Sequence, residues 1–262
     1  MKALAARRRH PLATVVLLTL ALLVTGAAYA LFAPGKADAS TTTTGSVERG
    51  QDLFLANCAT CHGLKASGTE VGPSLIGVGA AAVDFQVGTG RMPMQQTAPQ
   101  APQKPVELSE QDTADLAAYV ASLAPGPAIP DAETVAPEDD DESLANGAEL
   151  FRVNCAMCHN VVGAGGALTR GKFAPALAGV SPTHAYEAMV TGPQSMPVFN
   201  DQNITPENKK NVIAFINETY SKPNQGGMNL GNLGPVSEGM FIWIFGLGAI
   251  VAITVWITAK SN

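Results

Sequence analysis

All four cysteines of this 262-residue chain lie in two short motifs. The motifs are Cys58-Ala59-Thr60-Cys61-His62 and Cys155-Ala156-Met157-Cys158-His159. Their C-x-x-C-H spacing suits two thioether bonds to the vinyl groups of a haem, and the following histidine can bring an imidazole to the iron. A tetra-cysteine zinc site would leave both histidines without a role, and a redox dithiol would need only one motif. We therefore predict two covalently bound c-type haems (haem C), bound by Cys58, Cys61, His62, Cys155, Cys158 and His159.

Two methionines are candidates for the sixth ligand of each iron. Met92 and Met196 are each followed by proline at matching places in the chain. A thioether favours reduced iron and raises its potential, although methionine is also a common filler of cores. Met94 is the local alternative to Met92. The predicted metal ligands are thus His62 with Met92, and His159 with Met196.

Two prolines are expected beside the haem-ligating imidazoles. Pro73 and Pro175 each open a Pro-x-Leu-x-Gly-Val block after a motif. A backbone carbonyl there could accept the Nδ1 proton of the imidazole and fix its tautomer, with a simple turn as the alternative role. Another histidine, His184, follows Pro182 at an expected helix start, and we interpret it as a surface or capping residue.

The motifs belong to a duplicated unit. Residues 50–62 match residues 147–159 without a gap, and three further blocks match in the same order. One small domain was therefore duplicated. We predict first helices that run into the cysteines, capped by Ser46 and Ser143, and last helices that begin after Ser109 and at Thr205-Pro206. The crossing helices should bring Phe54 to Tyr119 and Phe151 to Phe215. No run alternates as a strand does.

A segment rich in proline and acidic residues separates the repeats. It contains four prolines and then five consecutive acidic residues. Proline breaks regular structure and like charges repel, so we predict a semi-extended, solvated linker over residues 125–142, which could also face a basic partner. The flanking domains are predicted at residues 46–124 and 143–221.

Two apolar runs, residues 11–35 and 239–259, carry no charged side chain. Each can cross the hydrocarbon core, which takes about 20 residues of helix. We predict a cytoplasmic basic tail with an N-terminal transmembrane anchor over residues 1–36, and a C-terminal transmembrane helix over 239–259. A cleaved signal peptide is the alternative for the first run. The arginine cluster at residues 7–9 predicts a multi-pass cell-membrane protein with its haem domains on the outer, periplasmic face.

The remaining composition excludes other functions. The formal net charge is −6 with 16 basic residues, so the chain lacks the electrostatic character of a nucleic-acid-binding protein. The sequence shows no quinone pocket, iron–sulfur site or nucleophile. We therefore assign no catalytic residue, and no complete active site, to this chain alone.

Each repeat resembles a class I cytochrome c domain, with C-x-x-C-H after a first helix, a Pro-containing loop, a Met-Pro loop and a last helix with an aromatic residue. The expected fold is therefore all-α: two tandem class I cytochrome c domains flanked by an N-terminal and a C-terminal transmembrane helix. The whole arrangement resembles the dihaem cytochrome c (cc) subunit of the actinobacterial cytochrome bc complex.

That resemblance implies an electron-transfer subunit of a menaquinol–cytochrome c reductase, an enzyme of the translocase class. Its partners would be the Rieske iron–sulfur subunit and the cytochrome b subunit, with a terminal haem-copper oxidase as electron acceptor. The alternatives are a dihaem cytochrome c subunit of a haem-copper oxidase, the electron-accepting cytochrome of a periplasmic dehydrogenase, and a haem-based sensor. The C-terminal span favours the reductase subunit, and the Met-Pro loops disfavour a sensor with an open sixth position.

Overall fold

The computed structural model describes residues 11–32, 44–138, 140–221 and 235–260. Its contacts divide the chain into two units, residues 1–42 and 43–262. Within the first unit the apolar run forms α2 (Pro11–Phe32), a helix of 22 residues without a charged side chain. The predicted basic tail, residues 1–10, lies outside the described residues.

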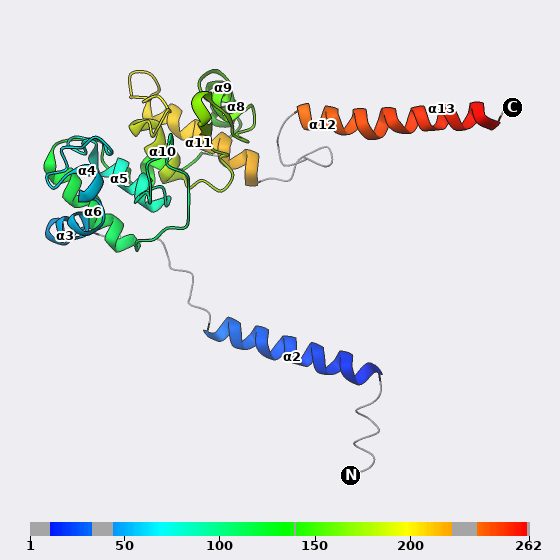
Figure 1. The fold of residues 1–262 in the computed structure, drawn as a ribbon, viewed down its shortest axis with the longest axis horizontal. Coiled ribbons are helices and arrows are strands. Elements are labelled where there is room, and N and C mark those ends of the chain that lie inside the picture. Colours follow the sequence, from blue (N-terminus) through cyan, green and yellow to red (C-terminus); the bar gives the residue numbers. More distant parts are fainter. Residues whose placement is uncertain (1–10, 33–43, 139, 222–234, 261–262) are drawn as a thin grey trace, which may run out of the picture. The chain divides into compact units, whose positions relative to one another are not determined.

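The residues predicted as the first repeat, 46–124, form helices. They are α3 (Val47–Asn57), α4 (Ala59–His62), α5 (Gly79–Gly88) and α6 (Glu110–Leu123). Helices α3 and α5 both pack against α6 (Figure 1). The Phe54 and Tyr119 rings lie 5.3 Å apart between their centroids, which confirms the predicted contact of first and last helices.

The caps predicted for these helices are confirmed. The Ser46 side chain accepts a hydrogen bond from the backbone of Arg49, at the start of α3. Ser109 and Asp112 form a reciprocal capping box at the start of α6. Such caps satisfy backbone donors that a helix leaves unpaired in its first turn.

The residues predicted as the second repeat, 143–221, form helices in the same order. They include α9 (Ala156–His159), α10 (Pro182–Thr191), α11 (Pro206–Ser221) and most of α8 (Asp141–Asn154). Helix α8 packs against α11, where the Phe151 and Phe215 rings lie 5.2 Å apart as predicted. The start of α11 is also as predicted, since the Thr205 hydroxyl accepts a hydrogen bond from the Asn208 N–H at 3.2 Å.

The predicted cap of α8 is wrong. Asp140, not Ser143, caps this helix, because its carboxylate accepts hydrogen bonds from the backbone N–H groups of Glu142 and Ser143. A carboxylate at this position also interacts favourably with the positive end of the helix dipole. Part of the acidic run therefore forms the first turn of α8 instead of a linker.

The linker segment is also more ordered than a semi-extended chain. It contains the short helix α7 (Ala132–Val135), capped by the Asp131 side chain, which accepts a hydrogen bond from Thr134 N–H at 2.7 Å. Val135 is buried in the apolar core of the second repeat. This single apolar anchor holds the middle of the segment against the second repeat.

A small hairpin corrects the expectation of no strands. Strands β1 (Gly166–Ala167) and β2 (Phe173–Ala174) pair antiparallel, with a 3₁₀ turn (Thr169–Gly171) between them. Strands of two residues are too short to show the alternation that identifies a strand in a sequence.

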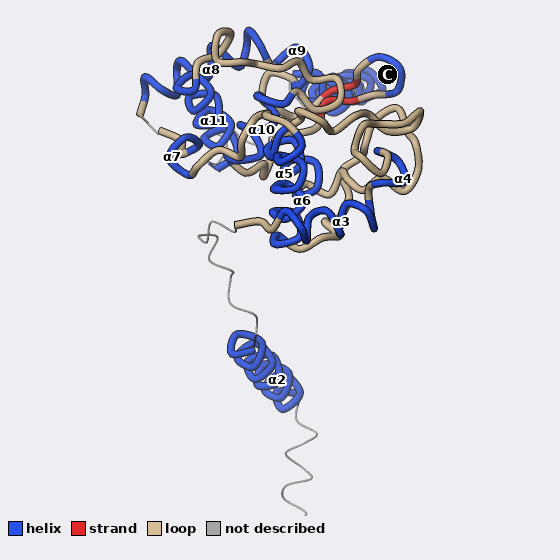
Figure 2. Tube along the Cα trace, turned by 90° about the vertical axis from the view of Figure 1, so that its left-hand side faces the viewer, coloured by secondary structure: helices blue, strands red, loops and turns tan. Residues whose placement is uncertain are grey.

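The two repeats contact each other within the second unit. Helix α5 packs beside α10, as Figures 1 and 2 show. The Gln100 side chain bonds the backbone of Phe173 twice, donating to its carbonyl and accepting from its N–H, both at 2.8 Å. The repeats are therefore joined by packing and hydrogen bonds as well as by the linker.

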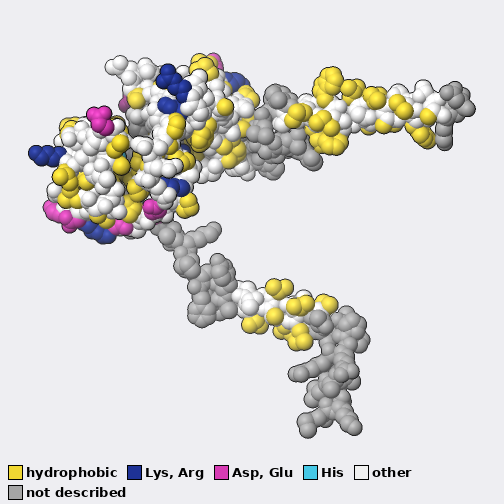
Figure 3. All heavy atoms as spheres, viewed as in Figure 1, with side chains coloured by type: hydrophobic (Ala, Val, Ile, Leu, Met, Phe, Trp, Pro, Cys, Tyr) yellow, Lys and Arg dark blue, Asp and Glu magenta, His cyan; other side chains and the backbone are white. Residues whose placement is uncertain are grey.

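The C-terminal run forms a helix that could cross a membrane. It comprises α12 (Pro235–Phe241), a π-helical turn (Ile242–Leu247) and α13 (Gly248–Lys260). Residues Ser237–Ala259 have a mean hydropathy of 2.4 and are not buried against the rest of the protein. Among the described residues this is the one helix long and apolar enough to span, because the apolar stretch Val15–Gly26 of α2 is shorter. Figure 3 shows exposed apolar side chains along both helices.

Candidate haem-binding sites

The two C-x-x-C-H motifs have matching backbone structures. The N–H groups of Cys61 and His62 both donate to the carbonyl of Cys58, at 3.1 and 3.0 Å. In the second motif Cys158 and His159 donate to the carbonyl of Cys155 at 3.1 and 2.9 Å. Residues three apart in a helical turn share one face, so each turn presents both sulfur atoms on the same side. All four thiols are free of disulfides.

Both histidines are oriented by a proline carbonyl, as predicted. Nδ1 of His62 lies 2.7 Å from the Pro73 oxygen, and Nδ1 of His159 lies 2.9 Å from the Pro175 oxygen. A carbonyl can only accept, so each Nδ1 carries the proton and each Nε2 keeps its lone pair. This is the tautomer that binds iron through Nε2.

Burial shifts the pKa values of three of the haem-binding side chains, His159, Cys58 and Cys155, towards the neutral form. Burial lowers the pKa of His159, more than its bond to the Pro175 carbonyl raises it. Burial also raises the pKa of Cys58 and of Cys155 to about 11, with a smaller contribution from the second cysteine of each motif. Each first cysteine is thus an uncharged thiol in apolar surroundings.

Apolar side chains next to the first motif are exposed in the protein alone. Leu64, Val71 and Ile76 are at least half exposed, at 76%, 55% and 50%. They lie in the loop that folds back on the motif through a bond from the Gly68 N–H to the His62 carbonyl at 2.8 Å. A flat apolar cofactor would cover such side chains. The residues present therefore fit a haem.

The predicted distal methionines each join the core that contains the first cysteine of their repeat. Met92 and Cys58 both pack, partly buried, against the first core. Met196 packs against the second core, which includes Cys155. Met94, the alternative to Met92, is not part of the first cluster. Ligation by either methionine stays a prediction.

The interface between the repeats contains residues that sequence reasoning did not assign to a site. The backbone N–H of His184 donates to the Ser181 hydroxyl at 3.1 Å, which fits the capping turn that we predicted. Its side chain, however, lies against the first repeat, 3.7 Å from the Asp84 carboxylate and edge-on to the Phe85 ring. One sequence signal for these residues was available. The His-x-x-Glu spacing on α10 places His184 and Glu187 on one face of the helix.

Known protein families match both repeats. Residues 47–124 match the family model described as cytochrome c. Residues 142–216 match the model described as cytochrome c oxidase, cbb3-type, subunit III. Two cytochrome c domains, each with its C-x-x-C pair, support covalently bound c-type haems in this chain.

Longer matches cover most of the chain. It is 45% identical over 228 residues to the cytochrome bc1 complex cytochrome c subunit of Corynebacterium efficiens, which covers 82% of this chain and 77% of that relative. It is 40% identical over 261 residues to the subunit of the same name from Mycobacterium tuberculosis, covering 97% and 93%. From these matches, the duplicated motifs and the apolar C-terminal helix, we conclude that the chain belongs to the family of cytochrome c subunits of the cytochrome bc1 complex.

Proposed function

We propose that this chain is the dihaem electron relay of a menaquinol–cytochrome c reductase, a translocase. The observation that carries the proposal is the pair of matching sites, each with a carbonyl-held histidine, in two repeats that contact each other. A bound haem supplies one-electron transfer. The protein supplies attachment, an oriented imidazole and a fixed arrangement of the two sites.

The site residues divide by role in this proposal. The thioether bonds are made by Cys58 and Cys61 in the first repeat and by the equivalent pair in the second. His62 and His159 are the proximal ligands. Met92 and Met196 are the distal ligands, and their packing against the cysteine-bearing cores supports this choice over Met94. The domains are residues 46–124 and 143–221.

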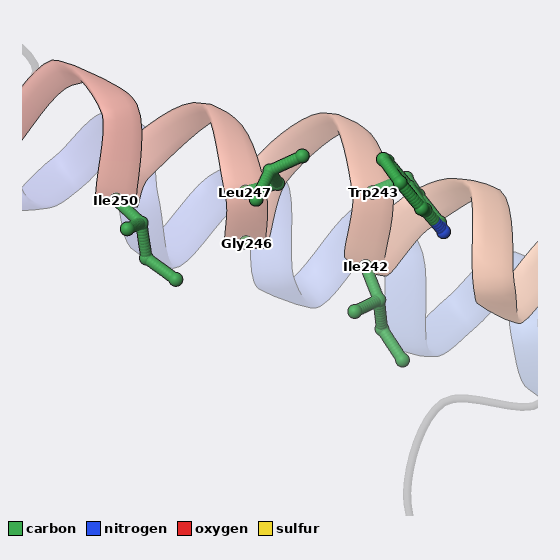
Figure 4. Close-up of a pocket in the computed structure, with 5 residues that line it drawn as sticks. All are labelled: Ile242, Trp243, Gly246, Leu247 and Ile250. Carbon is green, nitrogen blue, oxygen red and sulfur yellow. The ribbon is translucent and has the colours of Figure 1, made fainter.

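The proposed partners are the Rieske and cytochrome b subunits, with a terminal haem-copper oxidase as electron acceptor. The relatives' names place them in a cytochrome bc1 complex. The C-terminal helix offers a surface for a partner helix. Figure 4 shows Gly246 between Ile242 and Ile250, which project to one side, with Trp243 and Leu247 on another. A glycine on such a stripe lets a second helix approach closely.

The proposed topology is multi-pass. Helix α2 and the C-terminal helix would both cross the membrane, with both termini in the cytoplasm and the haem repeats on the periplasmic face. The arginine cluster before α2 and the apolar surface of both helices support this orientation.

Native purification through a tag on the full-length chain tests the proposal. The Rieske and cytochrome b subunits should co-purify, and added menaquinol should reduce both haems of the tagged chain. Because residues 142–216 match an oxidase subunit model, a dihaem oxidase subunit is the second candidate. Recovery of oxidase catalytic subunits without cytochrome b would favour that second candidate and contradict the first.

A further inference from the structure

A cluster of three potential metal ligands lies between the two repeats. Asp84 belongs to α5, and His184 and Glu187 belong to α10. One potential ligand atom from each lies within 4.8 Å of the others. The cluster is separate in sequence from both C-x-x-C-H motifs and both Met-Pro loops, and the proposed electron relay does not use it.

Glu187 is the unusual member of this cluster. Its side chain is fully buried, and neither carboxylate oxygen accepts a hydrogen bond from a described residue. Burial, followed by the nearby charge of Asp84 and by a side-chain hydrogen bond that protonated Glu187 can donate to Asp84, raises the pKa of Glu187 to about 10. A buried, unpaired carboxylate is costly, so this group needs either a proton or a cation.

His184 is placed to act with the two carboxylates. Its Nε2 atom lies 3.7 Å from Oδ2 of Asp84, too far for a normal hydrogen bond. Burial lowers the pKa of His184, which favours the neutral imidazole that binds metals. Gly88 of α5 leaves room for the ring, because a Cβ atom there would lie 3.2 Å from Nε2.

A metal ion, unlike a proton, would engage all three side chains of the cluster. A proton shared by Asp84 and Glu187 would satisfy the carboxyl pair but would leave the imidazole outside the interaction. Imidazole and carboxylate are both zinc ligands, and three such groups leave a fourth position of a tetrahedral site open to water. Zinc ligands lie about 2.0 to 2.2 Å from the metal, so ligand atoms that lie up to 4.8 Å apart must move closer together to bind one ion. The two carboxylates also offset the charge of a divalent ion.

The positive charge of Arg91 opposes the binding of a metal ion to the cluster. Arg91 is buried near the cluster, with its guanidinium carbon 4.7 Å from the centre of the Phe85 ring, and it lowers the pKa of His184. Together the two carboxylates, Arg91 and a divalent ion carry a net charge of +1. Without the ion, Glu187 holds a proton at neutral pH because its pKa is about 10, and Arg91 then offsets the charge of Asp84.

We propose that Asp84, His184 and Glu187 bind one divalent transition-metal ion, with Zn²⁺ the best-suited common ion, and that this ion bridges the two haem repeats. The site takes one ligand from the first repeat and two from the second. A metal bound there stabilises the interface in addition to the Gln100–Phe173 hydrogen bonds.

Equilibrium dialysis of the full-length, haem-loaded protein against Zn²⁺, after treatment with a chelator, tests the proposal. We expect one zinc ion per chain. Glu187→Gln, His184→Ala and Asp84→Asn should each weaken binding by more than the roughly 10- to 100-fold that loss of an outer-shell partner costs. Glu149→Gln, which changes an exposed carboxylate on α8, is the matched control and should bind as wild type does.

Zinc-edge X-ray absorption distinguishes this site from the cysteine motifs. The expected spectrum has only nitrogen and oxygen ligands, including one imidazole. A sulfur shell would show that zinc occupies haem-free cysteines, and would overturn the proposal. Failure of the wild-type protein to bind zinc would also overturn it, as would unchanged affinity in a cluster variant with normal haem content. Asp84→Asn keeps the test valid if a change at buried Glu187 prevents folding.

Discussion

At the scale of single residues, each imidazole is already oriented for iron by a backbone carbonyl. The carbonyls of Pro73 and Pro175 hold His62 and His159 at nearly the same distance. Side-chain substitution cannot remove a carbonyl, so this orientation depends on the backbone path of each loop. The sixth ligand of each iron is predicted to be a side chain instead, so mutation can test it directly.

Met92→His and Met196→His test the distal ligands. Each should abolish the sulfur-to-iron charge-transfer absorption of one oxidised haem and lower the potential of that haem, because imidazole stabilises ferrous iron less than a thioether does. Absorption spectra and redox titration measure both effects. Met94→Leu is the control and should leave the band intact. Loss of the band in that control, with no change in Met92→His, would make Met94 the ligand.

Glu187 predicts an unusual dependence of stability on pH in the chelator-treated protein. Its pKa is raised from 4.5 to about 10 in the folded state, so the folded protein binds more protons than the unfolded chain between these values. Stability should therefore fall as pH rises through this window. Urea midpoints measured at pH 5 to 9 should show a smaller decline in Glu187→Gln. Equal slopes in the two proteins would contradict the shifted pKa.

At the scale of helices, two equivalent glycines permit the crossing of first and last helices. A Cβ atom at Gly50 would lie 1.9 Å from the Asp115 carbonyl oxygen, and one at Gly147 would lie 1.9 Å from that of Asn211. Both oxygens belong to backbone, which cannot rotate away as a side chain does. The match between the repeats extends to this contact.

Gly50→Ala should therefore destabilise the first repeat. Forcing helices α3 and α6 apart should cost about 1 to 3 kcal/mol or more, as overpacking does. Denaturant unfolding followed by far-ultraviolet circular dichroism measures the loss. Ala56→Ser changes an exposed position of α3 and should have little effect. A wild-type midpoint for Gly50→Ala would show that the crossing is looser than in the structure.

Two substitutions distinguish Asp140 from Ser143 as the cap of α8. Asp140→Ala removes the acceptor for two backbone N–H groups of α8, so it should lower the unfolding midpoint of the second repeat. Ser143→Ala keeps that acceptor and should change the midpoint much less. A larger fall of the midpoint in Ser143→Ala than in Asp140→Ala would show that Ser143 is the cap.

The sequence was sufficient to predict the helix contacts within each repeat, but not the contact between the two repeats. The Phe54–Tyr119 and Phe151–Phe215 contacts followed from duplication, because equivalent residues must cross in equivalent ways. The cap of α8 could not be predicted in this way, because a run of acidic residues offers several possible N-terminal caps for the helix. The position of His184 beside Asp84 depends on how α10 packs on α5, which local patterns do not encode.

At the scale of the whole molecule, the haem repeats and the C-terminal helix have separable tasks. All four cysteines and the predicted ligands precede residue 222, whereas Ser237–Ala259 has no buried face in the chain itself. Truncation after Pro235 should therefore leave two haems attached. It should weaken association with the Rieske and cytochrome b subunits.

Haem staining after denaturing electrophoresis and co-purification measure these two effects of truncation. Gly246→Leu in the full-length chain is the finer variant, since it keeps the helix apolar and replaces the small residue between Ile242 and Ile250 with a large one. Full association and a normal rate of quinol-driven reduction in the truncated chain would show that this helix is only an anchor. A defect in truncation but not in Gly246→Leu would place the contact elsewhere on the helix.

The contact between the repeats has a kinetic consequence. Electron tunnelling slows exponentially with the separation of donor and acceptor, so two haems on a loose tether would exchange electrons only during rare close encounters, at a rate set by solvent viscosity. Packing of α5 on α10 and the paired Gln100–Phe173 bonds fix that separation instead. Electron transfer between the haems is then a first-order process whose rate does not depend on viscosity. Slow motions of the protein affect only the delivery of electrons to the first haem and their release from the second.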